Sequence, residues 1–239
     1  MAINIQIFRT RALTALIFVI VMLAGLFING WTFLLLFVFV GLGCLYEFGK
    51  IIKKIYGNSY LKYLPLGLFY IVLPISMMID LGISGNMFSM SDEINAEWSY
   101  TPLLPCAIIF SIWINDTMAY LVGSMIGKTP FSKISPKKTW EGTIGGMLLC
   151  VIVIALAGNY LPVPGAKIIS WKHWLTIAAL CAIFGTIGDL FESKLKRNAG
   201  IKDSGNFMPG HGGFLDRFDS LLLATPFVWL YVKLIFLDS

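Results

Sequence analysis

The chain has 239 residues, of which 57% are hydrophobic and only 13% are charged, and its mean hydropathy is +0.80. Soluble globular domains carry about 25% charged residues, so this composition excludes an ordinary soluble domain and predicts several membrane-spanning helices. The net charge of +5 does not indicate nucleic-acid binding, because Lys and Arg occur in short segments between apolar runs.

Apolar runs long enough to cross a bilayer, which takes about 20 helical residues, recur along the whole sequence. They predict an all-α, polytopic transmembrane bundle of about seven helices, within a range of six to nine. The expected segments are residues 12–28, 31–48, 63–80, 102–126, 142–157, 171–191 and 218–237. The fourth is long enough to be broken or to contain a re-entrant piece. No small-residue cleavage site follows the first run, so we expect a retained helix and not a signal peptide.

The distribution of positive charge predicts the orientation of the bundle. Fifteen of the eighteen Lys and Arg residues fall in the N-terminal tail and in the loops after the second, fourth and sixth segments. Cytoplasmic loops retain Lys and Arg, so the N-terminus is expected on the cytoplasmic side. The loop between the third and fourth segments carries three acids and no cation, as an outer loop should.

The domain organisation is expected to be simple, because the sequence shows no internal repeat and no soluble segment large enough to fold alone. We predict one integral-membrane domain over residues 1–239, with N-terminal helices in 1–110 and a catalytic part in 111–239. Four cysteines lie inside apolar runs without paired spacing, which indicates neither disulfides nor zinc. The spacing of Gly142 and Gly146 is typical of a helix-contact surface.

Polar, charged and glycine residues gather in residues 193–219, between the last two apolar runs. Five glycines disfavour a helix and let backbone amides approach a ligand, while the cations suit phosphate and the carboxylates suit magnesium. The glycines are Gly200, Gly205, Gly210, Gly212 and Gly213, and the cations are Lys194, Lys196, Arg197, Lys202 and Arg217. The stretch therefore indicates metal-bound phosphate chemistry.

Four aspartates lie at membrane depth or at its edge, namely Asp116, Asp189, Asp216 and Asp219. An ionisable residue inside a membrane is costly and is a functional-site hypothesis by default. The structural alternative is a buried ion pair or a helix cap, and it stays open for Asp219 beside Arg217. Glu192 and Asp219 each follow an aspartate by about one helical turn, which suggests auxiliary roles.

The order of motifs in residues 193–219 resembles that of the phosphatidate cytidylyltransferases, also called CDP-diacylglycerol synthases. The matching residues are Ser193, Lys196, Arg197, Lys202, Asp203, Pro209, His211, Gly212, Gly213, Asp216, Arg217 and Asp219. Met208 replaces the Leu, Ile or Phe that the family usually carries before the proline, which is an apolar-for-apolar change. Residues 115–123 and 137–142 also resemble the family, so the resemblance covers roughly residues 115–219.

The resemblance implies an enzyme that transfers CMP from CTP to phosphatidate, giving CDP-diacylglycerol and pyrophosphate for phospholipid biosynthesis. It implies Asp189, Asp216, Lys138 and Lys202 as catalytic residues, and Mg2+ held by Asp189 and Asp216. Asp219, one turn after Asp216, is a candidate auxiliary ligand, and a second cation is left open. The implied substrate-binding residues are Asp116, Lys137, Thr139, Glu141, Ser193, Lys196, Arg197, Asp203, His211, Gly212, Gly213 and Arg217. Thr139 would start the fifth helix beside Lys138, and Glu141 would orient the neighbouring lysines.

The expected partners are CTP, phosphatidate and membrane lipid, without nucleic acid. The oligomeric state is left open, with a homodimer as one alternative. The expected location is the bacterial inner membrane, with the active site facing the cytoplasm. Two other functions stay open. A CTP-dependent polyprenol or phytol kinase would use similar parts, and an ion-coupled transporter would also carry intramembrane acids, although a detectable repeat is missing.

Overall fold

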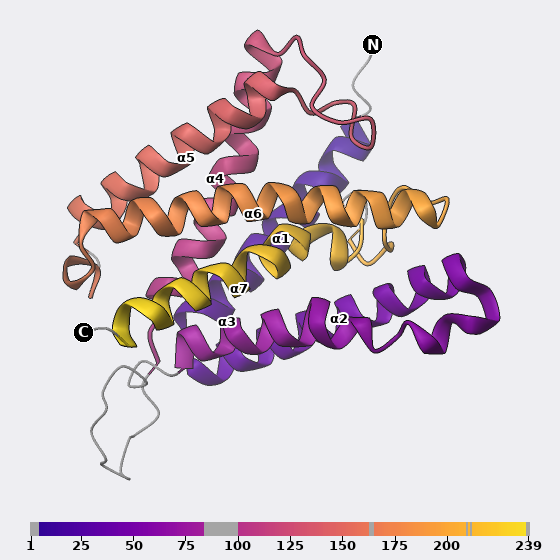
Figure 1. The fold of residues 1–239 in the computed structure, drawn as a ribbon, viewed down its shortest axis with the longest axis horizontal. Coiled ribbons are helices and arrows are strands. Elements are labelled where there is room, and N and C mark those ends of the chain that lie inside the picture. Colours follow the sequence, from indigo (N-terminus) through magenta and orange to yellow (C-terminus); the bar gives the residue numbers. More distant parts are fainter. Residues whose placement is uncertain (1–4, 84–99, 163–164, 209, 211, 238–239) are drawn as a thin grey trace.

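The computed structural model describes residues 5–83, 100–162, 165–208, 210 and 212–237 (Figure 1). These residues form seven α-helices with short connecting turns, and their only β-structure is two isolated bridges. The α-helices are α1 (Ile5–Phe27), α2 (Gly30–Tyr56), α3 (Leu73–Ile83), α4 (Leu103–Ile126), α5 (Trp140–Tyr160), α6 (Trp171–Asn198) and α7 (Leu215–Leu237). Three short helical turns are η1 (Gly57–Lys62), η2 (Leu68–Val72) and η3 (Ala166–Ile168).

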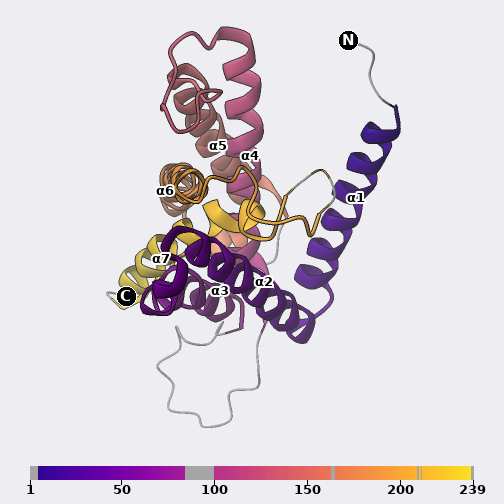
Figure 2. The same ribbon diagram turned by 90° about the vertical axis from the view of Figure 1, so that its right-hand side faces the viewer.

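The helices pack largely in chain order. Helix α5 packs against both α4 and α6, and α7 lies against α6 and α3 (Figure 1). Helix α1 packs mainly against α2 and stands apart from the other helices in Figure 2. Apolar side chains such as Ile108 of α4, Cys181 of α6 and Leu222 of α7 are fully buried between the helices. All four cysteines are free and buried, as expected of packing residues inside apolar runs.

Six of the helices are long and apolar enough to cross a membrane. The expected all-α polytopic fold is therefore confirmed, and the chain is an integral membrane protein. The third expected segment is different, because its continuous apolar helix covers only Leu68–Ile83 and falls short of the other six. Pro65, which lacks an amide proton, and the flexible Gly67 precede this helix and explain its late start. Helix α4 is continuous and contains no break.

Helix α6 continues well beyond the end predicted for it. The structure extends it to Asn198, and α7 already begins at Leu215, so the connecting loop is residues 199–214 instead of 193–219. Gly200 has a φ of 67° and ends α6: its amide donates to the Arg197 carbonyl, and the Ile201 amide donates to the Lys196 carbonyl. The loop is called the α6–α7 loop below. Several cations that the sequence placed in a loop, such as Lys196, are thus fixed on a helix face.

The close contact between α4 and α5 depends on two glycines. A methyl group at Gly142 or Gly146 would overlap backbone atoms of Ala119 in α4, and at Gly142 also those of Gly123. Small residues at such positions let membrane helices approach closely. The predicted helix-contact role of this glycine pair is confirmed.

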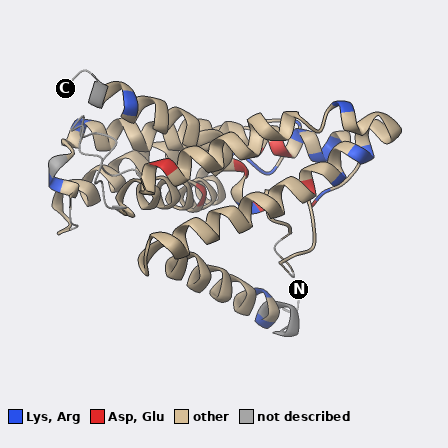
Figure 3. Cartoon of the chain, turned by 90° about the horizontal axis from the view of Figure 1, so that it is seen from below, with Lys and Arg blue, Asp and Glu red and all other residues tan. Residues whose placement is uncertain are grey.

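Positive charge is distributed unevenly along the bundle. Figure 3 shows most Lys and Arg toward the end that carries the α6–α7 loop and the end of α2, and few near the C-terminus. This asymmetry agrees with the pattern seen in the sequence. The side of the membrane on which the charged end lies stays a prediction.

Candidate functional site

A charged pocket of about 630 Å³ opens at the junction of α6, α7 and the α6–α7 loop. Carboxylates and cations both line it, so it suits an anionic ligand together with a cation. Its charged lining residues are Arg11, Asp116, Asp189, Lys196, Lys202, Asp203, Asp216, Arg217 and Asp219. Residues from five separate parts of the chain therefore meet in one cavity.

A second polar cavity of about 420 Å³, called the α5 pocket below, lies at the start of α5. Thr139 is the N-cap of α5, and its hydroxyl accepts a hydrogen bond from the Gly142 amide at 3.2 Å. The positive end of the helix dipole and the adjacent Lys137 and Lys138 favour phosphate here. Asp116 and Asp189 line both this pocket and the charged pocket, so the two cavities share a wall.

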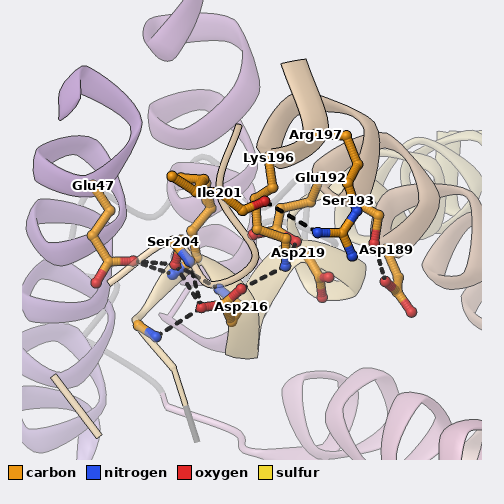
Figure 4. Close-up of polar contacts among 12 residues, drawn as sticks. Glu47, Asp189, Glu192, Ser193, Lys196, Arg197, Ile201, Ser204, Asp216 and Asp219 are labelled. Atoms are coloured by element: carbon orange, nitrogen blue, oxygen red, sulfur yellow. Dashed lines mark hydrogen bonds and ion pairs between the residues drawn. The ribbon is translucent and has the colours of Figure 1, made fainter. Parts of the chain in front are cut away.

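Asp189 lies in α6 and has partners on two sides. Its Oδ2 pairs with the ammonium group of Lys138. Its Oδ1 accepts a hydrogen bond from the Ser193 hydroxyl at 3.3 Å (Figure 4). Gly188 precedes it at the α6–α7 contact, where a methyl group would overlap the Asp219 carbonyl oxygen. That glycine therefore serves helix packing, which places Asp189 close to α7.

Asp216 lies in the first turn of α7, and its two oxygens have different environments. Oδ2 accepts hydrogen bonds from the amides of Ser204 and Gly213, both at 2.8 Å (Figure 4). Oδ1 accepts one from the ammonium group of Lys196 at 2.5 Å. Amides of the α6–α7 loop thus bond Oδ2, whereas Oδ1 is bonded by the Lys196 side chain, which a ligand could displace.

Two further acids are buried beside these aspartates. Glu192 is completely buried; its Oε2 pairs with Lys196, and neither of its oxygens has a hydrogen-bond partner that meets normal geometry. Asp219 is 8% exposed and accepts a hydrogen bond from the amide of Ser220 at 2.6 Å. Buried carboxylates with so few donors leave negative charge only partly compensated.

These oxygen donors fit a magnesium ion in chemical type. Hard carboxylate oxygens are the ligands that Mg2+ prefers, and the poorly compensated charge of Glu192 and Asp219 favours a cation nearby. Within the described residues, however, no group of three or more His, Cys, Asp or Glu side chains is placed to hold a metal ion. Lys138 and Lys196 currently neutralise Asp189 and Asp216. Magnesium binding stays a prediction.

The two pockets bring together most of the predicted site residues. The charged pocket contains Asp116, Asp189, Lys196, Lys202, Asp203, Gly212, Asp216, Arg217 and Asp219, and the α5 pocket adds Lys137, Lys138 and Thr139. Four predicted residues line neither pocket, namely Glu141, Ser193, Arg197 and Gly213. The predictions for His211 and Pro209 lie outside the described residues.

The contacts of Glu141 and Arg197 differ from those expected. Glu141 accepts hydrogen bonds from the amides of Lys128 and Thr129 at 3.2 Å and from the Thr129 hydroxyl at 2.8 Å. It therefore holds the start of the α4–α5 loop, and its role in orienting Lys137 and Lys138 stays a prediction. Arg197 donates from Nη1 to the Ile201 carbonyl at 3.2 Å, at the end of α6.

Two residues at the site were missed by the sequence analysis. Arg11 of α1 lines the charged pocket, and Glu47 of α2 is 4% exposed and bonds the α6–α7 loop. Glu47 is the only acid in α2 and follows its long apolar run, three residues before the first of the helix's lysines, and that is the signal that could have revealed it. Arg11 gave no such signal, because a cation before an apolar run is explained by topology.

An apolar groove of about 430 Å³ adjoins the charged pocket. It lies between α1, α2, the α6–α7 loop and the start of α7, and Met208 lines both cavities. Its lining residues are Thr14, Ile17, Phe18, Val21, Met22, Leu36, Phe39, Val40, Phe207, Met208, Phe214 and Phe218. A charged cavity and an apolar one thus meet at a single loop residue.

These features define a polytopic helical membrane protein in which carboxylates and cations converge at one end of the bundle. The chain belongs to the cytidylyltransferase family, whose model matches residues 65–235. The match confirms the resemblance found in the sequence and extends it into the third and seventh helices.

Named relatives agree with this family. The chain is 36% identical over 195 residues to phosphatidate cytidylyltransferase 4, chloroplastic, of Arabidopsis thaliana, which covers 78% of this chain and 47% of that protein. It is 43% identical over 133 residues to the phosphatidate cytidylyltransferase of Thermotoga maritima (54% and 48%), and 42% over 124 residues to that of Bacillus subtilis (52% and 45%). The chain spans about half the length of the curated relatives it matches.

Proposed function

We propose that this protein transfers CMP from CTP to phosphatidate and releases CDP-diacylglycerol and pyrophosphate, as an enzyme of phospholipid biosynthesis. The observation that carries the proposal is the junction at Met208 of the charged pocket with the apolar groove. An anionic lipid headgroup and its acyl chain need these two environments side by side. The names of the matched relatives support the same reaction.

The proposed reaction needs charge compensation more than acid–base chemistry. An oxygen of the lipid phosphate attacks the α-phosphorus of CTP, the α–β phosphoanhydride bond breaks, and pyrophosphate carries away the bonding electrons. A phosphate monoester is already ionised at neutral pH, so no base has to activate it. The protein has to reduce repulsion between anions, align them and stabilise the departing pyrophosphate.

Lysines around the two pockets are suited to that task. Lys138 and Lys196 hold their ammonium groups against Asp189 and Asp216, and Lys202 lines the charged pocket. In the proposed mechanism, substrate phosphates take over these ammonium groups. We place the CTP phosphates at the α5 pocket, where Thr139 caps the helix and its dipole adds to the attraction.

Magnesium is part of the proposal. Asp189 and Asp216 would hold it, with Asp219 as a further ligand and room for a second cation, and the ion would supply neutralisation of phosphate charge. The ordered donors on Asp216 Oδ2 leave Oδ1 as the oxygen that can turn to a ligand. Lys196, which releases that oxygen, stays within the pocket as a phosphate partner.

The proposed lipid lies with its phosphate in the charged pocket and an acyl chain in the apolar groove. Arg11 and Phe18 of α1 show this polarity along one helix, since the former lines the charged pocket and the latter the groove. We place the charged end at the cytoplasmic face of a bacterial inner membrane, because Lys and Arg concentrate there (Figure 3). The oligomeric state is left open, and crosslinking of the purified protein would test for a homodimer.

Position-specific labelling of CTP tests the reaction. With purified protein, phosphatidate and magnesium, label at the α-phosphorus should enter the lipid fraction, and label at the γ-phosphorus should leave in pyrophosphate. A lipid kinase would move the γ-label to a lipid alcohol and release CDP, and a transporter would transfer neither label. Diacylglycerol in place of phosphatidate is the matched control acceptor. Transfer of γ-label to lipid, with phosphatidate inert, would overturn the proposal.

A further inference from the structure

Glu47 of α2 is a buried carboxylate that lines neither polar pocket and bonds the α6–α7 loop. It is 4% exposed, although it is an acid in an apolar membrane helix. Its Oε1 accepts a hydrogen bond from the Phe214 amide at 3.0 Å, and its Oε2 accepts from the Leu215 amide at 2.9 Å and the Ser204 hydroxyl at 2.6 Å. Figure 4 shows the side chain reaching from α2 to this loop.

These contacts cap α7 from another helix. The first amides of a helix have no partner within it, and a carboxylate at that end also favours the helix dipole. The amides of Phe214 and Leu215 donate to Glu47, the Gly213 amide donates to Asp216, and the Asp216 amide donates to the Ser204 hydroxyl at 3.3 Å. Every amide from residue 213 to residue 216 therefore has an acceptor supplied by Glu47, Ser204 or Asp216.

Two glycines are explained by the approach of Glu47. A methyl group at Gly205 or Gly213 would overlap the Glu47 carboxylate. Gly43, about one turn before Glu47, has the same relation to the aromatic ring of Phe214. The loop is thus shaped to receive α2, and these glycines do not need a phosphate ligand to account for them.

Ser204 connects Glu47 to Asp216. Its hydroxyl oxygen lies 2.6 Å from Glu47 Oε2 and 2.9 Å from Asp216 Oδ2, but a hydroxyl has one proton to donate. The shorter distance assigns that proton to Glu47. Asp216 Oδ2 then relies on the amides of Ser204 and Gly213, and both amides are in the segment that Glu47 holds.

We propose that Glu47 is a positioning residue, which anchors the α6–α7 loop to α2 and, through Ser204, fixes the Asp216 carboxylate so that Oδ1 faces the charged pocket. Without the anchor, the first turn of α7 loses two of its amide acceptors and the Oδ2 contacts loosen together. The geometry of Asp216 then varies, and turnover falls although no group that touches substrate has been removed.

The structural arm of the test is amide hydrogen–deuterium exchange of the purified protein in detergent or nanodiscs. Glu47→Gln keeps the size of the side chain but has only one acceptor oxygen for three donors. We expect exchange in peptides covering residues 204–216 to become about tenfold faster, as loss of a hydrogen bond to a charged group predicts. Asp80→Asn is the matched control, because it also removes a carboxylate from a membrane helix, but away from this loop. Exchange of residues 204–216 should not change in this variant.

The kinetic arm rests on the proposed function and measures CMP transfer per folded molecule. Glu47→Gln should lower kcat about tenfold or more, with a smaller change in the KM for CTP. Ser204→Ala keeps the Glu47 acceptors of the Phe214 and Leu215 amides but removes the acceptor of the Asp216 amide, so it should lower kcat without faster exchange at residues 214–215. Ser204→Ala also tests the connection to Asp216 if the Glu47→Gln protein does not fold. In the double variant, the two effects on kcat should not multiply, because both act through Asp216.

The outcomes distinguish the anchoring of the loop by Glu47 from its effect on catalysis. Unchanged exchange in folded Glu47→Gln protein would overturn the anchor. Faster exchange with unchanged kcat, or independent effects of the two substitutions, would overturn the positioning role. If wild-type protein transfers no CMP, the proposed function fails, and exchange alone then decides whether Glu47 is the anchor of this loop.

Discussion

Lys138, directly before the N-cap of α5, forms an ion pair with Asp189 of α6, and Asp189 lines both polar pockets. The two side chains are 28% and 27% exposed, so the pair is reachable from the cavities. An ammonium group that pairs with a carboxylate at a cavity wall is also a group that can bind a phosphate. This ion pair therefore connects the expected nucleotide site with the expected metal site.

The first prediction concerns Asp189. Asp189→Asn keeps the shape of the side chain but removes the negative charge, so we expect kcat for CMP transfer to fall at least about 100-fold. Thermal unfolding of the purified variant should show a folded protein. The assay is run over a range of magnesium concentrations, with Asp80→Asn as the control. Turnover near that of wild type at saturating magnesium would remove Asp189 from the metal site.

The second prediction concerns Lys138. Lys138→Met retains the apolar part of the side chain and removes the charge, so we expect KM for CTP to rise about tenfold or more. Lys54→Met, at the end of α2, is the matched control, and its KM should not change. An unchanged KM for CTP in Lys138→Met would show that this lysine does not contact the nucleotide phosphates.

Much of the fold follows from local sequence, and the site follows only in part. Apolar length identified the helices, and the Gly142 and Gly146 spacing identified the α4–α5 contact, because both are properties of a single segment. The end of α6 was placed too early, since Lys194, Lys196 and Arg197 are polar but still good helix formers, and the helix stops only at Gly200.

Contacts between distant segments could not be predicted. Glu47 meets Ser204 across more than 150 residues of sequence, and nothing in either segment specifies the other. Glu141 was assigned to the lysines next to it in sequence, but its acceptors face Lys128 and Thr129 at the other end of the loop. Proximity along the chain is a weak guide to the partner of a charged side chain in a folded loop.

The third prediction tests the packing of α4 against α5. Gly146→Val would place side-chain atoms against the backbone of Ala119, so we expect the free energy of unfolding to fall by about 1–3 kcal/mol. Denaturant unfolding in detergent measures the change. Leu148→Val, at a position that is 60% exposed on the same helix, should change it little. Equal stability of Gly146→Val and wild type would mean that α4 and α5 pack less closely than described.

The fourth prediction concerns topology. Asn206 in the α6–α7 loop and Lys167 in η3 are both exposed and should lie on opposite sides of the membrane. The four native cysteines are buried, so Asn206→Cys and Lys167→Cys can be made with few side reactions. Impermeant thiol reagents should label Lys167→Cys in intact cells, and they should label Asn206→Cys only after the membrane has been permeabilised. Labelling of both from one side would contradict the predicted orientation.

The fifth prediction concerns an ion pair far from the two pockets. Asp80 of α3 accepts a hydrogen bond from the Trp229 indole at 2.6 Å and pairs with Lys233 at 2.9 Å, both in α7. The two charged side chains are about one-fifth exposed, at 22% and 17%, so the pair is only partly screened by solvent. Lys233→Met leaves the carboxylate with less compensation, and we expect the free energy of unfolding to fall by about 1–2 kcal/mol.

A double-mutant cycle separates this pairing from the loss of side-chain packing. Adding Asp80→Asn to Lys233→Met removes the uncompensated charge, so the double variant should be less destabilised than the sum of the single variants. Denaturant unfolding in detergent gives the four free energies, and CMP transfer should stay near the wild-type rate in the folded variants, because α3 and the end of α7 do not reach the pockets. Strict additivity would show that Asp80 and Lys233 are stabilised independently, and that the ion pair does not join α3 to α7.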